Sequence, residues 1–324
     1  MTPNRTVVDD AVLALLLEVA GTPKPGNVDR RRDLADLHFE AFLGGAVGAR
    51  EGLARAARGA TVGHAFDCAV AGMTDRAGTN TQFGCLLLLV PLLRATADGD
   101  LSPTGVERVT RETTVDDAVR FYRAFERVDV AVADPPPDAT DLDVRRGRAV
   151  EPTLRDRELT LRDVMATAAS PGESRVPDRN AQEWIEGFPR TFRAAAWIRE
   201  DVGPIADRAA RAFLGLLATE PDTLVATTHD PETAREASAR AAERIEADVP
   251  REVGPGADGR RPDAEAVHAI DLDAAESLAT AFVDEGINPG TTADLTCAAL
   301  YVALRHGVSV GDVGLPDQGP EGSR

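Results

Sequence analysis

Apolar residues recur through most of the chain at intervals of three and four, the spacing of an α-helix that is buried along one face. The first stripe consists of Val8, Val12, Leu15, Leu16 and Val19. The same period predicts further helices over 34–59, 61–76, 81–96, 103–113, 115–127, 160–169, 179–187, 191–198, 205–219, 231–247, 274–285 and 291–305. Alternating β-branched runs are scarce and aromatic residues make up only 4% of the chain, so a sheet has little to be built from. The predicted fold is therefore all-α, a compact multi-helix bundle.

Two stretches interrupt the helical pattern. Residues 134–148 contain three consecutive prolines and several aspartates, and residues 250–262 are rich in glycine, proline and charge. Both compositions favour exposed loops. Because the helices on either side of each loop carry apolar faces that need a common core, we expect a single helical domain over 1–313. Residues 314–324 have almost nothing to bury, which predicts a disordered tail.

The charge balance is strongly acidic. The 54 acidic residues exceed the 36 basic residues by 18, and Lys24 is the only lysine. Such a composition is typical of a salt-rich cytoplasm, because acidic side chains hold water and molar salt shortens the Debye length to roughly 3 Å. It argues against nucleic acid and anionic membranes as partners. An ordinary acidic protein is the alternative, but it leaves the near-absence of lysine unexplained.

The cysteines indicate a reducing compartment. Cys68, Cys85 and Cys297 each lie in an apolar helical context, without a CxxC pair or a Cys/His spacing that suits zinc. We interpret them as buried reduced thiols and expect a cytoplasmic location. The N-terminus shows no basic-then-apolar leader, and the longest apolar run, 85–93, is far shorter than the roughly 20 residues of a membrane span.

The segment 22–33 combines two prolines with the only lysine and three arginines. The prolines fix the backbone on both sides of Lys24, and Gly26 allows the chain to approach a ligand closely. Lys24, Arg30 and Arg31 belong to the densest positive patch of this acidic chain, which suits a triphosphate. The alternative is a turn that merely ends a helix and leaves the arginines in solvent.

Two further polar segments each precede an apolar helix. The first carries Thr79, Asn80 and Thr81, and the second carries Gly290, Thr291 and Thr292. The free N–H groups and partial positive charge of a helix N-terminus suit a phosphate. Both segments also fit a capping box, from Thr79 to Gln82 and from Thr291 to Asp294, so a purely structural role is open for each. If one phosphate-bearing substrate touches all three polar segments, they must converge on one cleft.

Taken in order, the three segments resemble the triphosphoribosyl-dephospho-CoA synthase family, which makes the prosthetic-group precursor of citrate lyase and malonate decarboxylase. The resemblance runs from Leu16 to Leu304 and rests on TPKPG-x-VD at 22–29, NT-x-x-G at 80–84 and PG-x-x-AD-L at 289–295. It implies a helical fold and transfer of the ribosyl C1′ of ATP to the 2′-hydroxyl of 3′-dephospho-CoA. It also implies that adenine is released while the triphosphate stays on the transferred ribose.

The segments depart from the pattern that bacterial members of this family usually show. Arg30-Arg31-Arg32 replace a stretch with asparagine and histidine, Gln82-Phe83 replace a stretch with lysine, and Thr291-Thr292 replace a glycine pair. In these positions the sequence more closely resembles the archaeal branch of the family, in which a citrate lyase partner need not exist. A related nucleotide or coenzyme acceptor therefore stays open beside dephospho-CoA.

The implied reaction is a substitution at an anomeric carbon, so it needs a carboxylate to take the proton of the attacking hydroxyl. The candidates are Asp29 and Asp294. Asp29 lies in the cationic segment and should stay ionised, which favours contact with ribose or with the Mg²⁺ expected to accompany ATP. Asp294 is then the better candidate for the base. His38 is a candidate for protonating the departing adenine, although a single histidine on a helix is more often structural.

Two other functions are compatible with these segments. One is a helical nucleotide phosphohydrolase in which Asp29, Asp36 and Asp294 hold a metal, and it would leave adenine attached to ribose. The other is a non-catalytic nucleotide-binding protein, which would bind ATP without turnover. The sequence leaves the oligomeric state open between a monomer and a homo-oligomer.

Overall fold

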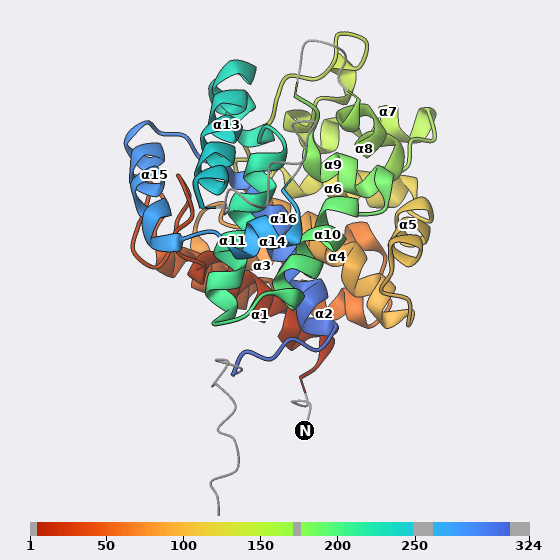
Figure 1. Ribbon diagram of the computed structural model, residues 1–324. Coiled ribbons are helices and arrows are strands. Elements are labelled where there is room, and N and C mark those ends of the chain that lie inside the picture. Colours follow the sequence, from red (N-terminus) through yellow and green to blue (C-terminus); the bar gives the residue numbers. More distant parts are fainter. Residues whose placement is uncertain (1–4, 171–175, 249–261, 312–324) are drawn as a thin grey trace, which may run out of the picture.

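The computed structural model describes residues 5–170, 176–248 and 262–311. Within these ranges the fold is all-α, as the apolar period predicts, and the only β-type pairing is two isolated bridges in the segment 29–37. The helices of Figure 1 are α1 (Val7–Ala20), α2 (Phe39–Ala57), α3 (Val62–Ala77), α4 (Phe83–Ala97), α5 (Pro103–Arg111), α6 (Val115–Ala124), η1 (Thr140–Leu142), η2 (Val144–Val150), α7 (Glu151–Asp156), α8 (Leu161–Ala169), α9 (Arg179–Glu186), α10 (Pro189–Glu200), α11 (Ile205–Thr219), α12 (Thr223–Thr228), α13 (Pro231–Asp248), α14 (Ala264–His268), α15 (Leu272–Asp284) and α16 (Gly290–Arg305).

Helix α16 forms the centre of the core. Thirteen of its 16 residues are buried, and α1, α4, α10 and α11 all pack against it. Figure 1 shows α16 enclosed by other helices, as expected for a helix that is apolar on nearly every side. Because α1 and α16 come from opposite ends of the described chain, their contact draws both ends into one core. The predicted domain limit at residue 313 lies outside the described residues.

Helix α4 is continuous although it contains Pro91. Proline has no N–H to donate to the carbonyl four residues earlier, which here belongs to Leu87. The indole Nε1 of Trp184, on α9, donates to that carbonyl instead, at 3.2 Å. Since a buried carbonyl without a partner is costly, this contact stabilises the packing of α9 against α4.

The longest apolar run of the sequence lies in α4, which has only 15 residues. A helix needs about 20 predominantly apolar residues to cross the hydrocarbon layer. Among the helices of the described ranges, none is both long and apolar enough for such a span.

Helix α2 begins at Phe39, so the start predicted at residue 34 was wrong. The N–H of Phe39 donates to Asp33 Oδ1 at 2.8 Å, and Leu34 and Leu37 exchange backbone hydrogen bonds in a tight turn. An aspartate that accepts from the backbone nearby offers the chain an alternative to the helix. As a result, Asp36 and Leu37 lie in a loop and line the cavity described below.

Five short helices were not predicted, namely η1, η2, α7, α12 and α14. None exceeds seven residues, which is too short for an apolar period to be recognised. Because η1 and η2 fall largely within 134–148, the exposed loop predicted there is partly helical, and Ala139 and Gly147 are buried. The predicted loop 250–262 lies almost entirely outside the described residues, and the predicted tail 314–324 lies wholly outside them.

Helices α2 and α3 approach each other closely through glycines. A Cβ atom on Gly48 would lie 2.0 Å from the carbonyl oxygen of Gly72, and one on Gly52 would lie 2.2 Å from the backbone nitrogen of Ala69. Real Cβ atoms do not approach backbone atoms so closely, so the crossing requires glycine at these positions.

Gly52→Ala is expected to lower the free energy of unfolding by about 1 to 3 kcal/mol, because the added methyl group would force α2 and α3 apart. Gly44→Ala is the matched control on the same helix, since a Cβ there would meet nothing closer than 3.4 Å. It should leave stability unchanged or raise it by up to about 1 kcal/mol through helix propensity. Urea unfolding measures both, and equal effects would contradict the close crossing.

Candidate active site

A single cavity of about 580 Å³ receives residues from all three polar segments. Its wall includes Asn27 from the first segment, Thr79, Asn80 and Thr81 from the second, and Gly290, Thr291 and Asp294 from the third. The predicted convergence of the three segments on one cleft is thus confirmed. Several predicted binding residues do not belong to the described wall, namely Lys24, Gly26, Arg30, Arg31 and Thr292.

The Asp294 carboxyl faces this cavity from near the start of α16 and accepts two hydrogen bonds. Asn180 Nδ2 donates to Oδ2 at 2.8 Å, and the Cys85 thiol donates to Oδ1 at 3.2 Å. Burial raises the pKa of Asp294 to about 7, although both hydrogen bonds oppose the rise, and the charge of Glu18 adds to it. The carboxyl can therefore exchange a proton near neutral pH.

Asp294 does not cap its own helix. No side chain at the N-cap position of α16 accepts a hydrogen bond, and the capping box predicted from Thr291 is absent. Instead, the backbone N–H and the hydroxyl of Thr292 both donate to Asp222 Oδ2 at 2.7 Å. Because Asp222 satisfies the first turn of α16, Asp294 is left to face the cavity.

The capping box predicted from Thr79 is also absent, since α4 begins at Phe83. Asn80 Oδ1 accepts from the Phe83 N–H at 3.2 Å. The Thr81 hydroxyl and the Asn180 Oδ1 atom are buried and have no hydrogen-bond partner in the part of the chain that the structure describes. Buried polar atoms are normally paired, so these two atoms, on residues that line the cavity, are exceptions in the packing around the site.

Gly84 brings α4 directly against the third segment. A Cβ atom at this position would lie 1.9 Å from Asp294 Oδ2 and 2.7 Å from Asn180 Nδ2. Only a residue without a side chain leaves room there for the hydrogen bond between Asn180 and Asp294. Gly84 therefore allows the second and third segments to share one site.

The Lys24 side chain is fully buried. Its Nζ atom forms an ion pair with Glu18 and donates to Asn27 Oδ1 at 3.0 Å. Glu18 and Asn27 line the cavity, so the ammonium lies directly behind the wall. Burial raises the pKa of Glu18, and the charge of Lys24 opposes that rise. Direct binding of a phosphate by Lys24 stays a prediction.

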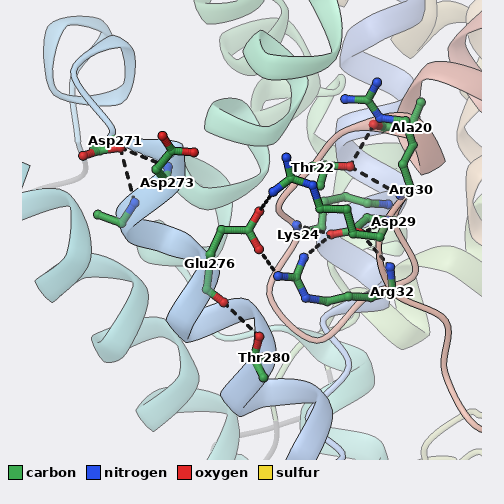
Figure 2. Close-up of polar contacts among 12 residues, drawn as sticks. Ala20, Thr22, Lys24, Asp29, Arg30, Arg32, Asp271, Asp273, Glu276 and Thr280 are labelled. Atoms are coloured by element: carbon green, nitrogen blue, oxygen red, sulfur yellow. Dashed lines mark hydrogen bonds and ion pairs between the residues drawn. The ribbon is translucent and has the colours of Figure 1, made fainter.

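Asp29 uses both carboxylate oxygens to fold the first segment. Oδ2 accepts from the backbone N–H of Lys24 and from Arg32 Nη1, at 3.1 and 2.9 Å. Oδ1 accepts from the backbone N–H groups of Arg31 and Arg32, at 2.8 and 3.0 Å. Figure 2 shows Arg32 between Asp29 and Glu276 of α15. These contacts dock the segment on α15, and Asp29 is not part of the described cavity wall.

Gly26 and Asn27 connect the first segment to the third. Gly26 has a φ of +71°, and a Cβ atom there would lie 1.8 Å from the carbonyl oxygen of Ile287. Asn27 Nδ2 donates to Asn288 Oδ1 at 2.9 Å. The freedom of the glycine thus serves a close contact between two loops of the protein.

The remaining predicted residues of the first segment and its surroundings lie at the surface. Arg30 is exposed, and Arg31, with 65% of its side chain exposed, pairs with Glu276. The side chain of His38 is 63% exposed, and its Nδ1 lies 3.4 Å from Asp33 Oδ2. His38 does not belong to the described cavity wall, and its role in protonating adenine stays a prediction.

The match of a protein-family model decides the family. The model for CitG, described as ATP:dephospho-CoA triphosphoribosyl transferase, matches residues 4–310. The chain belongs to the CitG family. It is similar to the crystal structure of a proposed triphosphoribosyl-dephospho-CoA synthase from Archaeoglobus fulgidus, with 22% identity and a TM-score of 0.60 over 82% of this chain and 99% of that one. No curated protein matches the chain.

The sequence did not single out three residues that complete the site of this CitG-family transferase, namely Glu18, Cys85 and Asn180. Glu18 carried a signal, because it lies between Leu15 and Val19 on the apolar stripe of the first helix and its carboxylate is therefore expected to be buried. The interpretation of Cys85 as a buried thiol is correct, but nothing in the sequence pointed to its hydrogen bond to Asp294. For Asn180 no local pattern points to the partner 114 positions away.

Asp294→Asn should change how stability depends on pH. The pKa of Asp294 is raised from 3.8 to about 7, so the folded wild type binds this proton more tightly than the unfolded chain. The free energy of unfolding of the wild type should therefore fall as pH rises between about 4 and 7. The Asp294→Asn variant should not show this decrease, because asparagine does not titrate. Between pH 5 and pH 8, the free energy of unfolding of the variant should rise by roughly 2 to 3 kcal/mol relative to that of the wild type. Urea unfolding measures this, and a pH-independent difference would contradict the raised pKa.

Lys24→Met is expected to lower the free energy of unfolding by about 3 to 5 kcal/mol, because it leaves the buried Glu18 without its partner. Combining it with Glu18→Leu should recover most of that loss, since the unpaired charge is removed. Arg31→Met is the control, because its ion pair with Glu276 is exposed and should contribute less than about 1 kcal/mol. Urea unfolding compares all three, and no recovery in the double variant would speak against the pairing.

Proposed function

We propose that this cavity is the site at which the triphosphoribosyl group of ATP passes to an acceptor hydroxyl, with Asp294 as the general base. The family supplies the reaction, an ATP:dephospho-CoA triphosphoribosyl transfer. The observation that supports the residue assignment is the cavity-facing Asp294 carboxyl, whose pKa burial raises to about 7. A base whose pKa lies near the working pH transfers protons most effectively.

In the proposed reaction, the Asp294 carboxylate takes the proton of the acceptor 2′-hydroxyl while that oxygen forms its bond to C1′ of the ATP ribose. The bond from C1′ to N9 of adenine breaks, and its electron pair leaves with adenine, which gains one proton. The triphosphate stays on the transferred ribose. The proton lost by the hydroxyl balances the proton gained by adenine. Asn180 keeps the base in position through its 2.8 Å hydrogen bond.

The triphosphate is proposed to bind at the start of α4, where Thr79, Asn80 and Thr81 line the cavity. The N–H groups of a first helical turn suit phosphate oxygens. No lysine or arginine belongs to the cavity wall in the ranges that the structure describes. Backbone and hydroxyl donors, with Lys24 behind the wall, would therefore supply most of the protein's contacts to the phosphates.

Mg²⁺ is proposed only as part of the Mg–ATP substrate. Both oxygens of Asp29 are taken by N–H donors, and within the described ranges no three His, Cys, Asp or Glu side chains are arranged to hold a metal ion. These residues do not fit a resident magnesium site. The same geometry disfavours a phosphohydrolase in which Asp29, Asp36 and Asp294 share a metal.

The acceptor and the cellular setting belong to the same proposal. We favour 3′-dephospho-CoA, because the family is described by that acceptor, and a related nucleotide is the second candidate. The acidic composition with a single lysine supports a salt-rich cytoplasm, and the departures from the bacterial pattern at 30–32, 82–83 and 291–292 support the archaeal branch of the family. A homo-oligomer stays a prediction.

Asp294→Asn should reduce adenine release from ATP at least 100-fold, because asparagine cannot accept the proton. The matched control is Asp36→Asn, which changes a carboxyl on the same cavity wall that has no part in the proposed proton transfer. Chromatography of adenine released in molar salt, with and without dephospho-CoA, measures both variants. Release of phosphate with adenine still attached to ribose, or equal losses in both variants, would overturn the proposal.

A further inference from the structure

An aromatic cluster forms part of the cavity wall, and we call Phe83, Phe121 and Phe125 the aromatic wall. The ring centroids of Phe83 and Phe125 are 4.8 Å apart, and those of Phe121 and Phe125 are 5.1 Å apart, both in edge-to-face arrangements. Phe83 and Phe121 are only 5% and 4% exposed, whereas Phe125 is partly exposed. Phe125 therefore offers the most ring surface to a ligand.

The segment after α6 covers the aromatic wall. The Tyr122 hydroxyl donates to the carbonyl oxygen of Leu142 at 2.6 Å, which fixes η1 against α6. Leu142 and Val144 line the cavity together with Pro135. This part of the segment predicted as an exposed loop thus adds apolar side chains to the cavity, and apolar surface beside aromatic rings favours a flat and weakly polar group.

The aromatic wall lies beside the proposed base. Phe83 directly precedes Gly84, whose backbone approaches Asp294 so closely that a Cβ would lie 1.9 Å from Oδ2. In ATP, adenine is bonded directly to the C1′ atom that reacts. A pose that brings C1′ near Asp294 and directs the purine along α4 towards Phe83 places the ring at the aromatic wall. The pantetheine arm of the acceptor is many bonds away from the reacting hydroxyl and has no such direct link to the reacting atoms.

From this geometry we infer that the aromatic wall is the binding subsite for the adenine ring of ATP, the leaving group of the transfer. The inference rests on the proposed function. Aromatic faces bind purines by stacking, typically with 1 to 3 kcal/mol per base. The carboxylate of Asp129 also lines the cavity, and it favours the positive charge that a purine carries when a ring nitrogen is protonated before its bond to C1′ breaks. The bond's electron pair then stays on N9, and neutral adenine is released.

Free adenine is the probe that tests this subsite, by calorimetric titration of the full chain in molar salt. Phe125→Leu should weaken adenine binding at least 5-fold, which is the lower end of the stacking range. Phe125→Tyr keeps the ring and should bind adenine within about 2-fold of wild type. Phe66→Leu is the matched control, because Phe66 packs 5.0 Å from Phe83 in the same cluster but is 1% exposed and is not part of the described cavity wall. It should also stay within about 2-fold of wild type.

Inhibition of the wild type provides a measurement that does not depend on any variant folding. Adenine should compete with ATP and not with dephospho-CoA. If adenine competes with dephospho-CoA alone, the aromatic wall binds the adenine of the acceptor instead. If pantetheine binds tightly and Phe125→Leu abolishes this binding, the aromatic wall binds the pantetheine arm of the acceptor. Either result would overturn the inference, as would adenine binding that is equal in Phe125→Leu and wild type. If the wild type still releases adenine from ATP, such results leave the proposed function intact, whereas absence of release would contradict the function itself.

Discussion

The arrangement of the site depends on one steric constraint, the approach of α4 to the Asp294 carboxyl at Gly84. The carboxyl oxygen occupies the space in which any other residue at position 84 would place its Cβ. This contact joins two polar segments that lie about 200 positions apart, and Asn180 completes it through its hydrogen bond to Asp294. The first segment joins the same site by a second close approach, that of Gly26 to the carbonyl of Ile287. Glycines at these two positions therefore permit contacts between protein segments.

The only lysine of the chain serves the site from behind its wall. A buried ion pair such as Lys24 with Glu18 contributes little net stability, because desolvation of both charges offsets their attraction. Its effect here is positional, since the ammonium holds Glu18 and Asn27, both on the cavity wall. A compact ammonium fits an enclosed position among these groups better than a planar guanidinium does. This gives a physical reason for a lysine at this position in a chain that otherwise uses arginine.

The electrostatics of the cavity differ from those of a usual phosphate site. The described wall contains carboxylates and no lysine or arginine, while the exposed Arg31 pairs with Glu276 on the surface of α15. An acidic and partly apolar cavity raises the pKa of Asp294 and favours positive charge on a departing base. The same cavity opposes a highly charged substrate, which is why the proposed function assigns phosphate binding to backbone donors, hydroxyl groups and a cation that arrives with ATP.

The sequence by itself determined the helical class, most helix positions, the three polar segments and the resemblance to the family, because each of these depends on residues that are close together in the chain. It also pointed to Asp294. Only the tertiary structure decided that Asp294 faces a cavity rather than capping α16, since the first turn of α16 is bound at Thr292 by Asp222, which lies 70 positions before Thr292. Likewise, only the tertiary structure shows that Asp29 and Lys24 have partners within the protein, Arg32 and Glu18. Asn180 and the aromatic wall were not predicted, because their meaning arises from contacts between helices that no local period or spacing encodes.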